Sequence, residues 1–274
     1  MHTYTKHFDS ILGMSAYMEK NWEYWEQGDK SGSSFTDCLS HDEARKVMSH
    51  GGYYEAGAKR LTKAHIDGAK FPMQRSPMPV PAPAMAGHRA NVPAFLSGSP
   101  MGMVRNIDQP LGDKRCRILV AVAASAGVKH EALMNRGAAI MGCIEALQSE
   151  GYAVELTAGW FTKRLDYARV DLTLNVKSYQ DTFNPAALAY ILAEPSYLRK
   201  TLFSLCNILQ EKHPESSALE GIRGGLGQPI TDLEGLGYDI VFDGVHLSGE
   251  WTPKNSADKA MGKVHEWLAK HGEH

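Results

Sequence analysis

The pattern of apolar and polar residues predicts alternating strands and helices over the second half of the chain. Residues 115–127, RCRILVAVAASAG, form an apolar run ending in small residues, which indicates a buried strand. Residues 153–161 and 167–178 indicate two further strands. Because only a short segment separates these two, we expect them to pair as an antiparallel hairpin. A fourth strand is expected at 237–246.

Helical spacing fills the intervals between these strands. Residues 129–150 carry apolar side chains at helical spacing, and Gly151 follows them. Asn184 and Pro185 begin a second helix, Pro195 restarts it, and residues 256–270 form a last one. This order predicts an α/β fold with a mostly parallel sheet and helices on both faces. We expect the first strand in the middle of the sheet and the hairpin at one edge.

The first 110 residues predict a different organisation. Ser40 and Glu43 match a capping box that opens a helix over residues 41–50, and residues 53–68 indicate a second helix. Prolines then alternate with other residues from Pro77 to Pro83, which excludes a helix and a central strand. This segment is expected to be a strap over the surface or a ligand for a proline-reading module. The predicted division is an N-terminal helical region with a Pro-rich extended segment (1–110) and an α/β core domain (111–274).

Composition narrows the class of protein without giving its function. The chain has 274 residues, of which 43% are hydrophobic, and no run reaches the roughly 18 apolar residues of a membrane helix. The first residues do not resemble a signal peptide, so a cytoplasmic location is expected. The net charge is -2, but residues 44–117 hold twelve Lys or Arg against four acids. Such a segment indicates an anionic partner, or simply a solvated surface.

The end of the first strand is the place where open α/β sheets bind ligands. A strand followed by a hairpin resembles the von Willebrand factor A domain, a Rossmann-like fold with a D-x-S-x-S metal motif at this point. Here Ala123 stands at the aspartate position, Ser125 at the first serine and Gly127 at the second serine. Because alanine offers no oxygen ligand, we expect no divalent metal at Ser125. The small residues indicate a tight strand-to-helix turn. The alternative is that they let a phosphate approach the N-terminus of the next helix.

Catalytic motifs were not found, and no cofactor is expected. The sequence contains no G-x-S-x-G, H-E-x-x-H, G-x-G-x-x-G or G-K-[ST] pattern. Asp243 falls near the end of the fourth strand, and the loop from Arg223 to Pro229 is rich in glycine. A phosphate-handling enzyme using these groups therefore stays open as an alternative. The four cysteines have no metal-ligand spacing and are expected to be reduced and packed as small hydrophobic residues.

Aromatic residues next to basic ones are typical of proteins that bind single-stranded nucleic acid. Tyr53 and Tyr54 precede one basic group, and a second group is expected at an exposed hairpin tip. The candidate binding residues are Lys59, Arg60, Lys63, Arg75, Trp160, Phe161, Lys163, Arg164, Tyr167 and Arg169. The alternative is that Trp160 and Phe161 belong to the core.

Three stretches, HRANVPAFLSGSPMGM, VAVAASAGVKHEALMNRGAAI and NPAALAYILAEPSYLRKTLF, resemble a family of uncharacterised phage and prophage proteins. The resemblance spans about residues 40–245 and implies a viral context in a host cell. It also places five residues in family motifs without giving them roles: Arg105, Ser125, Arg136, Pro195 and Arg199. We therefore expect a non-enzymatic phage protein that binds single-stranded DNA or RNA in transcription or replication.

A role in transcription or replication also implies protein partners. A phage or host polymerase is a candidate partner, a homo-oligomer is a further candidate, and no membrane is expected. The main alternative is a protein-binding adaptor of the von Willebrand A type or a virion-associated protein.

Overall fold

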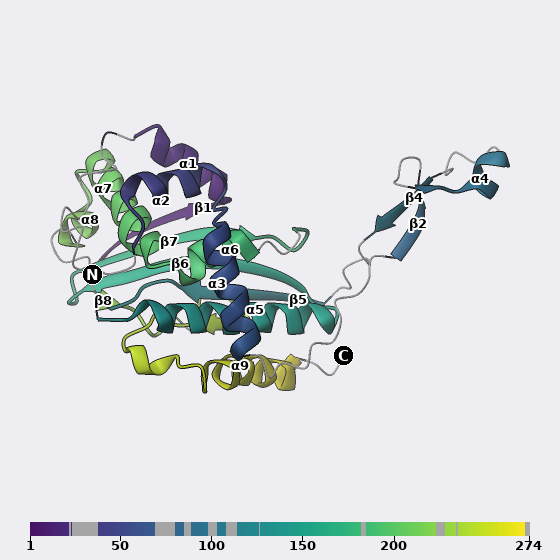
Figure 1. Ribbon diagram of the computed structural model, residues 1–274. Helices are drawn as coiled ribbons and strands as arrows, with labels where there is room; N and C mark the ends of the chain where they lie inside the picture. Colours follow the sequence, from purple (N-terminus) through teal and green to yellow (C-terminus); the bar gives the residue numbers. More distant parts are fainter. Residues whose placement is uncertain are drawn as a thin grey trace.

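The protein consists of a body, built on one six-stranded sheet, and an arm that stands apart from it (Figure 1). The computed structural model describes residues 1–21, 23, 38–68, 80–84, 89–97, 103–107, 114–125, 127–181, 185–222, 228–233 and 235–271. We define the arm as β2 (Val80–Ala84), β3 (Arg89–Ala90), α4 (Val92–Leu96) and β4 (Met103–Ile107).

The body contains the remaining elements. Its strands are β1 (His2–Phe8), β5 (Arg115–Ala121), β6 (Ala153–Arg164), β7 (Ala168–Lys177), β8 (Gln228–Pro229) and β9 (Ile240–Phe242). Its helices are α1 (Ile11–Glu19), α2 (His41–Ser49), α3 (Glu55–Gly68), α5 (His130–Ser149), α6 (Pro185–Ala193), the π-helical turn η2 (Tyr197–Leu202), α7 (Phe203–Lys212), α8 (Ser217–Ile222), the 3-10 turn η3 (Ser248–Glu250) and α9 (Ser256–His271). No helix in the described ranges combines the length and the apolar character needed to cross a membrane.

The sheet has the order β1-β7-β6-β5-β9, with β8 beside the last residues of β6. β5 pairs in parallel with β6 and β9, and β6 pairs antiparallel with β7, so the mostly parallel α/β sheet and its hairpin are confirmed. Two details differ from the expectation. β5 lies next to the edge strand β9 rather than in the middle, and the hairpin is not the edge, because β1 pairs with the outer side of β7.

Described elements of the N-terminal region contribute to the sheet and to the main core. β1 alternates exposed residues with Tyr4, Lys6 and Phe8, and Phe8 is buried in the main core. Helices α1, α2 and α3 contribute buried residues to the same cluster, including Met14, Met48 and Leu61. In the described residues, β1 and α1–α3 thus share one apolar core with the elements that follow residue 114.

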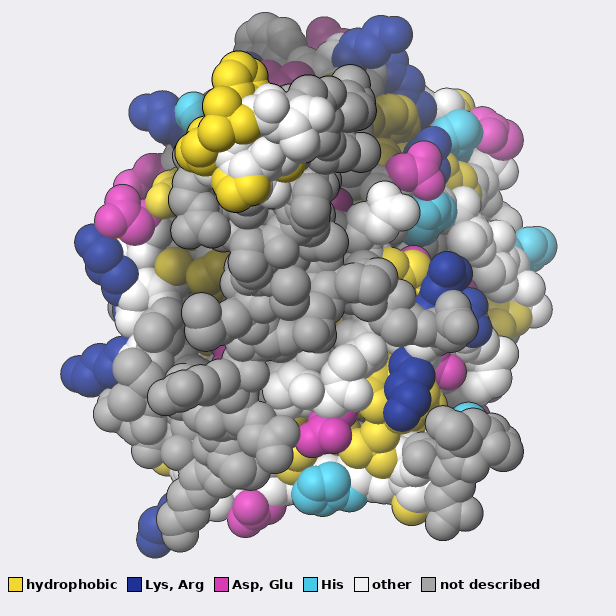
Figure 2. Space-filling view, turned by 90° about the vertical axis from the view of Figure 1, so that its right-hand side faces the viewer, with side chains coloured by type: hydrophobic (Ala, Val, Ile, Leu, Met, Phe, Trp, Pro, Cys, Tyr) yellow, Lys and Arg dark blue, Asp and Glu magenta, His cyan; other side chains and the backbone are white. Residues whose placement is uncertain are grey.

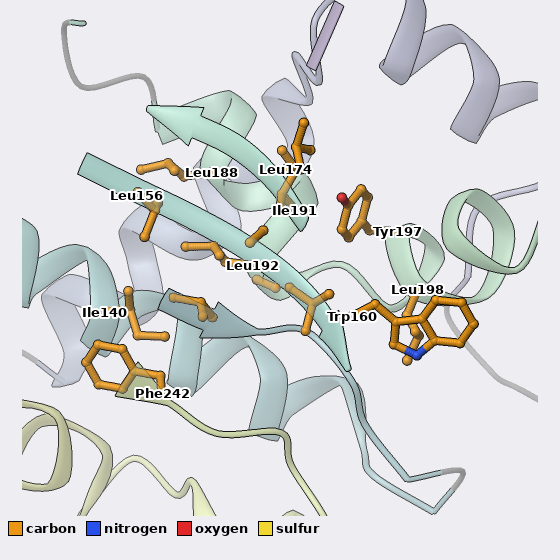
Figure 3. Close-up of a cluster of buried hydrophobic side chains, with 14 of the residues drawn as sticks. Ile140, Leu156, Trp160, Leu174, Leu188, Ile191, Leu192, Tyr197, Leu198 and Phe242 are labelled. Atoms are coloured by element: carbon orange, nitrogen blue, oxygen red, sulfur yellow. The ribbon is translucent and has the colours of Figure 1, made fainter. Parts of the chain in front are cut away.

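The two faces of the sheet are covered differently. The main core joins residues of one face, such as Ile118 and Val120 of β5, to the buried sides of the helices. Figure 3 shows part of this core, with side chains from the sheet facing those of α5, α6 and η2. On the other face, Leu119, Ala121 and Phe161 pack against Ile230 and Leu233, which lie in a loop. In the described residues the second face is thus covered by a loop where helices were expected.

The arm explains the Pro-rich sequence in an unexpected way. β2 is an edge strand of a three-stranded antiparallel sheet with the order β2-β4-β3. Proline has no N–H to donate, so Pro81 and Pro83 are tolerated only on an edge strand. The segment is extended as expected, but residues 80–84 pair with β4 and do not form a strap over the body.

Candidate functional site

The aromatic residues expected at the hairpin tip are buried. Trp160 is 3% exposed and packs against Phe203, with the ring centroids 5.9 Å apart; Phe161 is 2% exposed. β6 continues to Arg164, so both aromatics lie in the middle of the strand, opposite Leu172 and Asp171 of β7. The expectation of an exposed stacking platform at these two positions is wrong, because both faces of β6 are covered here.

Two of the remaining basic residues of the hairpin, Arg164 and Arg169, form hydrogen bonds within the protein. Lys163 is exposed, while the Arg164 guanidinium donates through Nη1 to the main-chain oxygen of Gly221 at 3.0 Å. Arg169 donates through Nε to both carboxylate oxygens of Asp171, at 2.8 and 2.9 Å. Tyr167 is exposed at the tip. The charge of Arg169 is therefore neutralised, and the exposed basic groups are Lys163 and Arg164.

The exposed side of α3 carries the other basic group. Lys59, Arg60 and Lys63 are all exposed, whereas Gly57 and Leu61 on the opposite side are buried. Their spacing places the three cations on one face of the helix. Lys59 forms an ion pair with Glu55, with Nζ 2.8 Å from Oε1.

An aromatic side chain precedes this basic row. Tyr53 is 55% exposed just before α3, and Tyr54 is half-buried against Tyr190. Arg75, the last expected member of this group, lies outside the described residues. An accessible aromatic ring thus precedes a short basic row on α3, and one member of this row, Lys59, is paired with Glu55.

The carboxyl ends of β5 and β9 are closed by the protein itself. The N–H of Ser125 donates to the oxygen of Val245, and the N–H of Val245 donates to the oxygen of Ala123, both at 2.9 Å. Arg136 of α5 is 1% exposed and aims its guanidinium at this edge. Through Nη2 it donates to the main-chain oxygens of Ala121, Phe242 and Asp243, at 2.9, 3.0 and 2.7 Å. Where a ligand would approach an open sheet, a buried cation of the chain already holds the strand ends.

Burial lowers the pKa of Arg136 to about 10, and the neighbouring carboxylates of Asp243 and Glu250 oppose this shift. The guanidinium is therefore charged at neutral pH. Because it faces the strand oxygens and not the surface, we do not assign it to a phosphate site. The sequence signal was a single arginine among small apolar residues of α5, which the resemblance marked without a role.

A second group of buried polar side chains follows α6 and was not anticipated. The Ser196 hydroxyl donates to Glu194 Oε1 at 3.0 Å and accepts from the Leu39 N–H at 2.6 Å. His130 Nε2, at the start of α5, lies 3.7 Å from Glu194 Oε2. Arg199 and Lys200 are buried in the π-helical turn η2 that follows. These contacts join the beginnings of α2 and α5 to η2, so the group fixes helix positions within the body.

Three of the four cysteines are buried thiols. The four cysteines are free thiols, and burial raises the pKa of Cys116, Cys143 and Cys206 to about 12, which keeps them protonated. Within the part of the chain that the structure describes, no three His, Cys, Asp or Glu residues are grouped as metal ligands. The glycine-rich loop is described only at Gln228 and Pro229, which form β8.

Comparison with known proteins gives the family and no activity. Neither a curated protein nor a solved structure matches the chain. One family model, described as a domain of unknown function (DUF7192), matches residues 2–272. The match includes β1, the arm and α9, and thus nearly the whole length of the chain. The chain belongs to the DUF7192 family.

Proposed function

We propose that the protein is a non-enzymatic binding protein for single-stranded nucleic acid and that α3 carries the contact. The observation behind this proposal is the row of Lys59, Arg60 and Lys63 on the exposed side of α3, with the exposed ring of Tyr53 before it. Cations attract the phosphate backbone, and an exposed ring stacks on a base that is not paired. We therefore assign the interface to α3 and not to the hairpin, where Trp160 and Phe161 are buried.

The position of α3 in the chain supports the same assignment. Residues 69–107 follow this helix and contain four basic residues, Lys70, Arg75, Arg89 and Arg105, and no acid. The resemblance to phage proteins supports a role on the single strands that transcription and replication expose. A polymerase of the phage or its host is the partner that such a role implies. The competing proposal is a protein-binding adaptor of von Willebrand A type. It is distinguished from the first proposal by its lack of affinity for nucleic acid.

The first prediction compares two double variants that remove the same charge. Arg60→Ala with Lys63→Ala is expected to weaken binding to a single strand of about 12 nucleotides, short enough for one protein copy, by about tenfold. It should also flatten the slope of log K against log salt by about 1.4, because each phosphate contact on a single strand contributes about 0.7. Fluorescence anisotropy at several salt concentrations, with single-stranded DNA, single-stranded RNA and duplex DNA, measures both quantities.

The control pair is Lys163→Ala with Arg164→Ala, at the hairpin. It should change affinity and slope much less than the α3 pair, and a larger effect would contradict the assignment to α3. Tyr53→Ala should weaken binding by about 1–3 kcal/mol without changing the salt slope, while Tyr53→Phe should retain the affinity. Equal, weak binding to single strands and duplex by every variant would remove the proposal and favour the adaptor.

A further inference from the structure

The outer side of β1 offers backbone groups to another strand. The N–H of His2 donates to the oxygen of Tyr167 at 2.7 Å, so the backbone groups of His2 face β7. Because these groups alternate between the two sides of a strand, those of Thr3, Thr5 and His7 face away from β7. In the described ranges β1 pairs with β7 alone, and these three residues are exposed. Their N–H and C=O groups are thus available for pairing at the end of the sheet.

This edge lacks the usual protection against pairing, which consists of prolines, bulges, short strands or projecting charges. The seven residues of β1 contain no proline and pair with β7 without a register shift. Lys6 does not project over the edge, because its ammonium lies over the rings of Phe8 and Tyr17, 5.6 and 5.2 Å from their centroids. The strand at the opposite edge, β9, has only three residues. Of these two edges, β1 is therefore the one open to a partner.

The sequence of β1 is complementary to itself when two copies run antiparallel. A two-fold axis at Thr5 places Thr5 opposite Thr5 of the second copy, Thr3 opposite His7, and Tyr4 opposite Lys6. This register engages all three outward residues of both copies, and it leaves no like charges directly opposite each other. An axis at Lys6 would place the two Lys6 side chains opposite each other, which is unfavourable. The pattern therefore favours a second copy with the axis at Thr5.

We propose that the protein forms a two-fold dimer in which β1 pairs antiparallel with β1 of a second copy. The pairing joins the two six-stranded sheets into one continuous sheet. Because both copies contribute the same surface, the contact closes at two copies. A single pair of strands makes a small interface, so we expect a dissociation constant of roughly 1–100 µM. The contact uses neither α3 nor Tyr53, so it goes beyond the proposed nucleic-acid site and is tested without nucleic acid.

The first experiment is sedimentation velocity on the full chain at protein concentrations from about 1 to 200 µM, a range that spans this dissociation constant. The mass of the wild type should rise from that of a monomer to that of a dimer and stop there. Thr5→Pro should remain monomeric, because proline has no N–H to donate to the second copy. The Thr5 N–H faces away from β7, so the variant should unfold within a few degrees of the wild type.

A charge exchange at Thr5 tests the position of the axis. Thr5→Lys and Thr5→Glu each place like charges opposite each other, and each should weaken dimerisation by up to about fivefold. An equal mixture of the two variants should form a heterodimer about tenfold tighter than either homodimer, because opposite charges then meet. Thr5 is exposed, so neither substitution disturbs the core. A mixture that dimerises no better than its components would overturn the pairing at Thr5.

The exposed apolar side chains of α4 are the main alternative surface for self-association. Phe95 and Leu96 are 71% and 78% exposed, and hydrophobic side chains gather in the upper part of Figure 2, which looks onto the arm. The control variant, Phe95→Ser with Leu96→Ser, should dimerise like the wild type. Lost dimerisation in this variant would assign the contact to α4 and contradict the proposal. A wild type that stays monomeric at every concentration, or a Thr5→Pro variant that still dimerises, would overturn it as well.

Discussion

Replacing Arg136 by methionine is expected to lower the free energy of unfolding by about 2–4 kcal/mol. The buried guanidinium donates to three main-chain oxygens at the ends of β5 and β9, and it lies over the Trp251 ring at 5.7 Å from the centroid. Methionine fills a similar volume but donates nothing, so these oxygens lose their charged donor inside the protein. A buried acceptor without a donor costs about 1–3 kcal/mol.

An opposing effect has to be weighed against this loss. Burying a charge is costly, and apolar replacements of buried ion pairs are often neutral or stabilising. In those cases both partners are replaced. At Arg136 the acceptors are backbone oxygens, which stay in place whatever residue stands at this position. The substitution therefore removes the donors and leaves the buried acceptors behind. We therefore expect the loss of donors to outweigh the relief of desolvation.

Urea unfolding of the wild type and two variants tests this balance. Arg136→Lys keeps a positive charge and three donors but lacks the planar group over Trp251, so its stability should lie between that of the wild type and that of Arg136→Met. All three proteins should share one m-value, which shows that the surface exposed on unfolding has not changed. Equal stability of Arg136→Met and the wild type would contradict the role of Arg136 as the cation that holds the strand ends.

Local sequence patterns correctly predicted the elements that are determined by contacts between residues close together in the chain. Ser40 caps α2 in a capping box with Glu43, as the spacing predicts: the Glu43 N–H donates to Ser40 Oγ at 3.2 Å, and the Ser40 N–H donates to Glu43 Oε2 at 2.9 Å. The apolar run at β5, the helix α5 and the hairpin β6–β7 follow from periodicity and a short connection. In each case, the deciding contacts lie within a few residues or along one element.

Tertiary contacts decided the elements that the sequence did not predict. β1 is a polar segment with only Tyr4, Lys6 and Phe8 on its inner side, and it becomes a strand because β7 offers an unpaired edge. Which strand lies at an edge depends on partners more than a hundred residues away, as β1 and β7 show. Alternating prolines excluded a central strand correctly, but the pairing of β2 with β4 could not be read from them.

Some residues of the candidate site could be placed from the local sequence, and others could not. Exposure of Lys59, Arg60 and Lys63 follows from their helical spacing, because polar residues on one face of a helix meet solvent. The burial of Arg136 and Glu194 could not be predicted from the sequence, because a charged residue is normally expected at the surface. The internal role of Arg136 depends on oxygens at the ends of two strands, one of which is more than a hundred residues away in sequence.

The side chains at Trp160 and Phe161 show why a local motif was misleading. Two adjacent strand residues point to opposite faces, so at most one of them is buried if a sheet is covered on one side. Trp160 packs in the main core, whereas Phe161 packs with Leu119, Ile230 and Leu233 on the other face. The loop that covers this second face follows the hairpin by more than fifty residues, and nothing near Phe161 in the sequence indicates it.

Replacing Trp160 by alanine is therefore expected to lower the free energy of unfolding by about 3–5 kcal/mol, the cost of truncating a buried aromatic residue. The indole packs against Phe203, and a small apolar cavity lined by Phe8 and Leu172 already lies beside it. Truncation would enlarge this cavity, and neighbouring side chains held in β7 cannot move far enough to fill it. Urea unfolding at constant m-value measures the loss, with Tyr167→Ala at the exposed hairpin tip as a control that should change stability by less than about 0.5 kcal/mol.

The two roles considered for Trp160 are separated by Trp160→Leu, which keeps an apolar side chain but has no aromatic face. If Trp160 is a core residue, this variant should be destabilised by less than Trp160→Ala and should bind single-stranded DNA with wild-type affinity. If Trp160 stacks on a base, the leucine variant should lose about 1–3 kcal/mol of binding free energy while stability changes little. Anisotropy titrations at a temperature where the variant is fully folded distinguish these outcomes. Lost affinity in a folded leucine variant would return the hairpin to the interface and contradict the burial of Trp160 in solution.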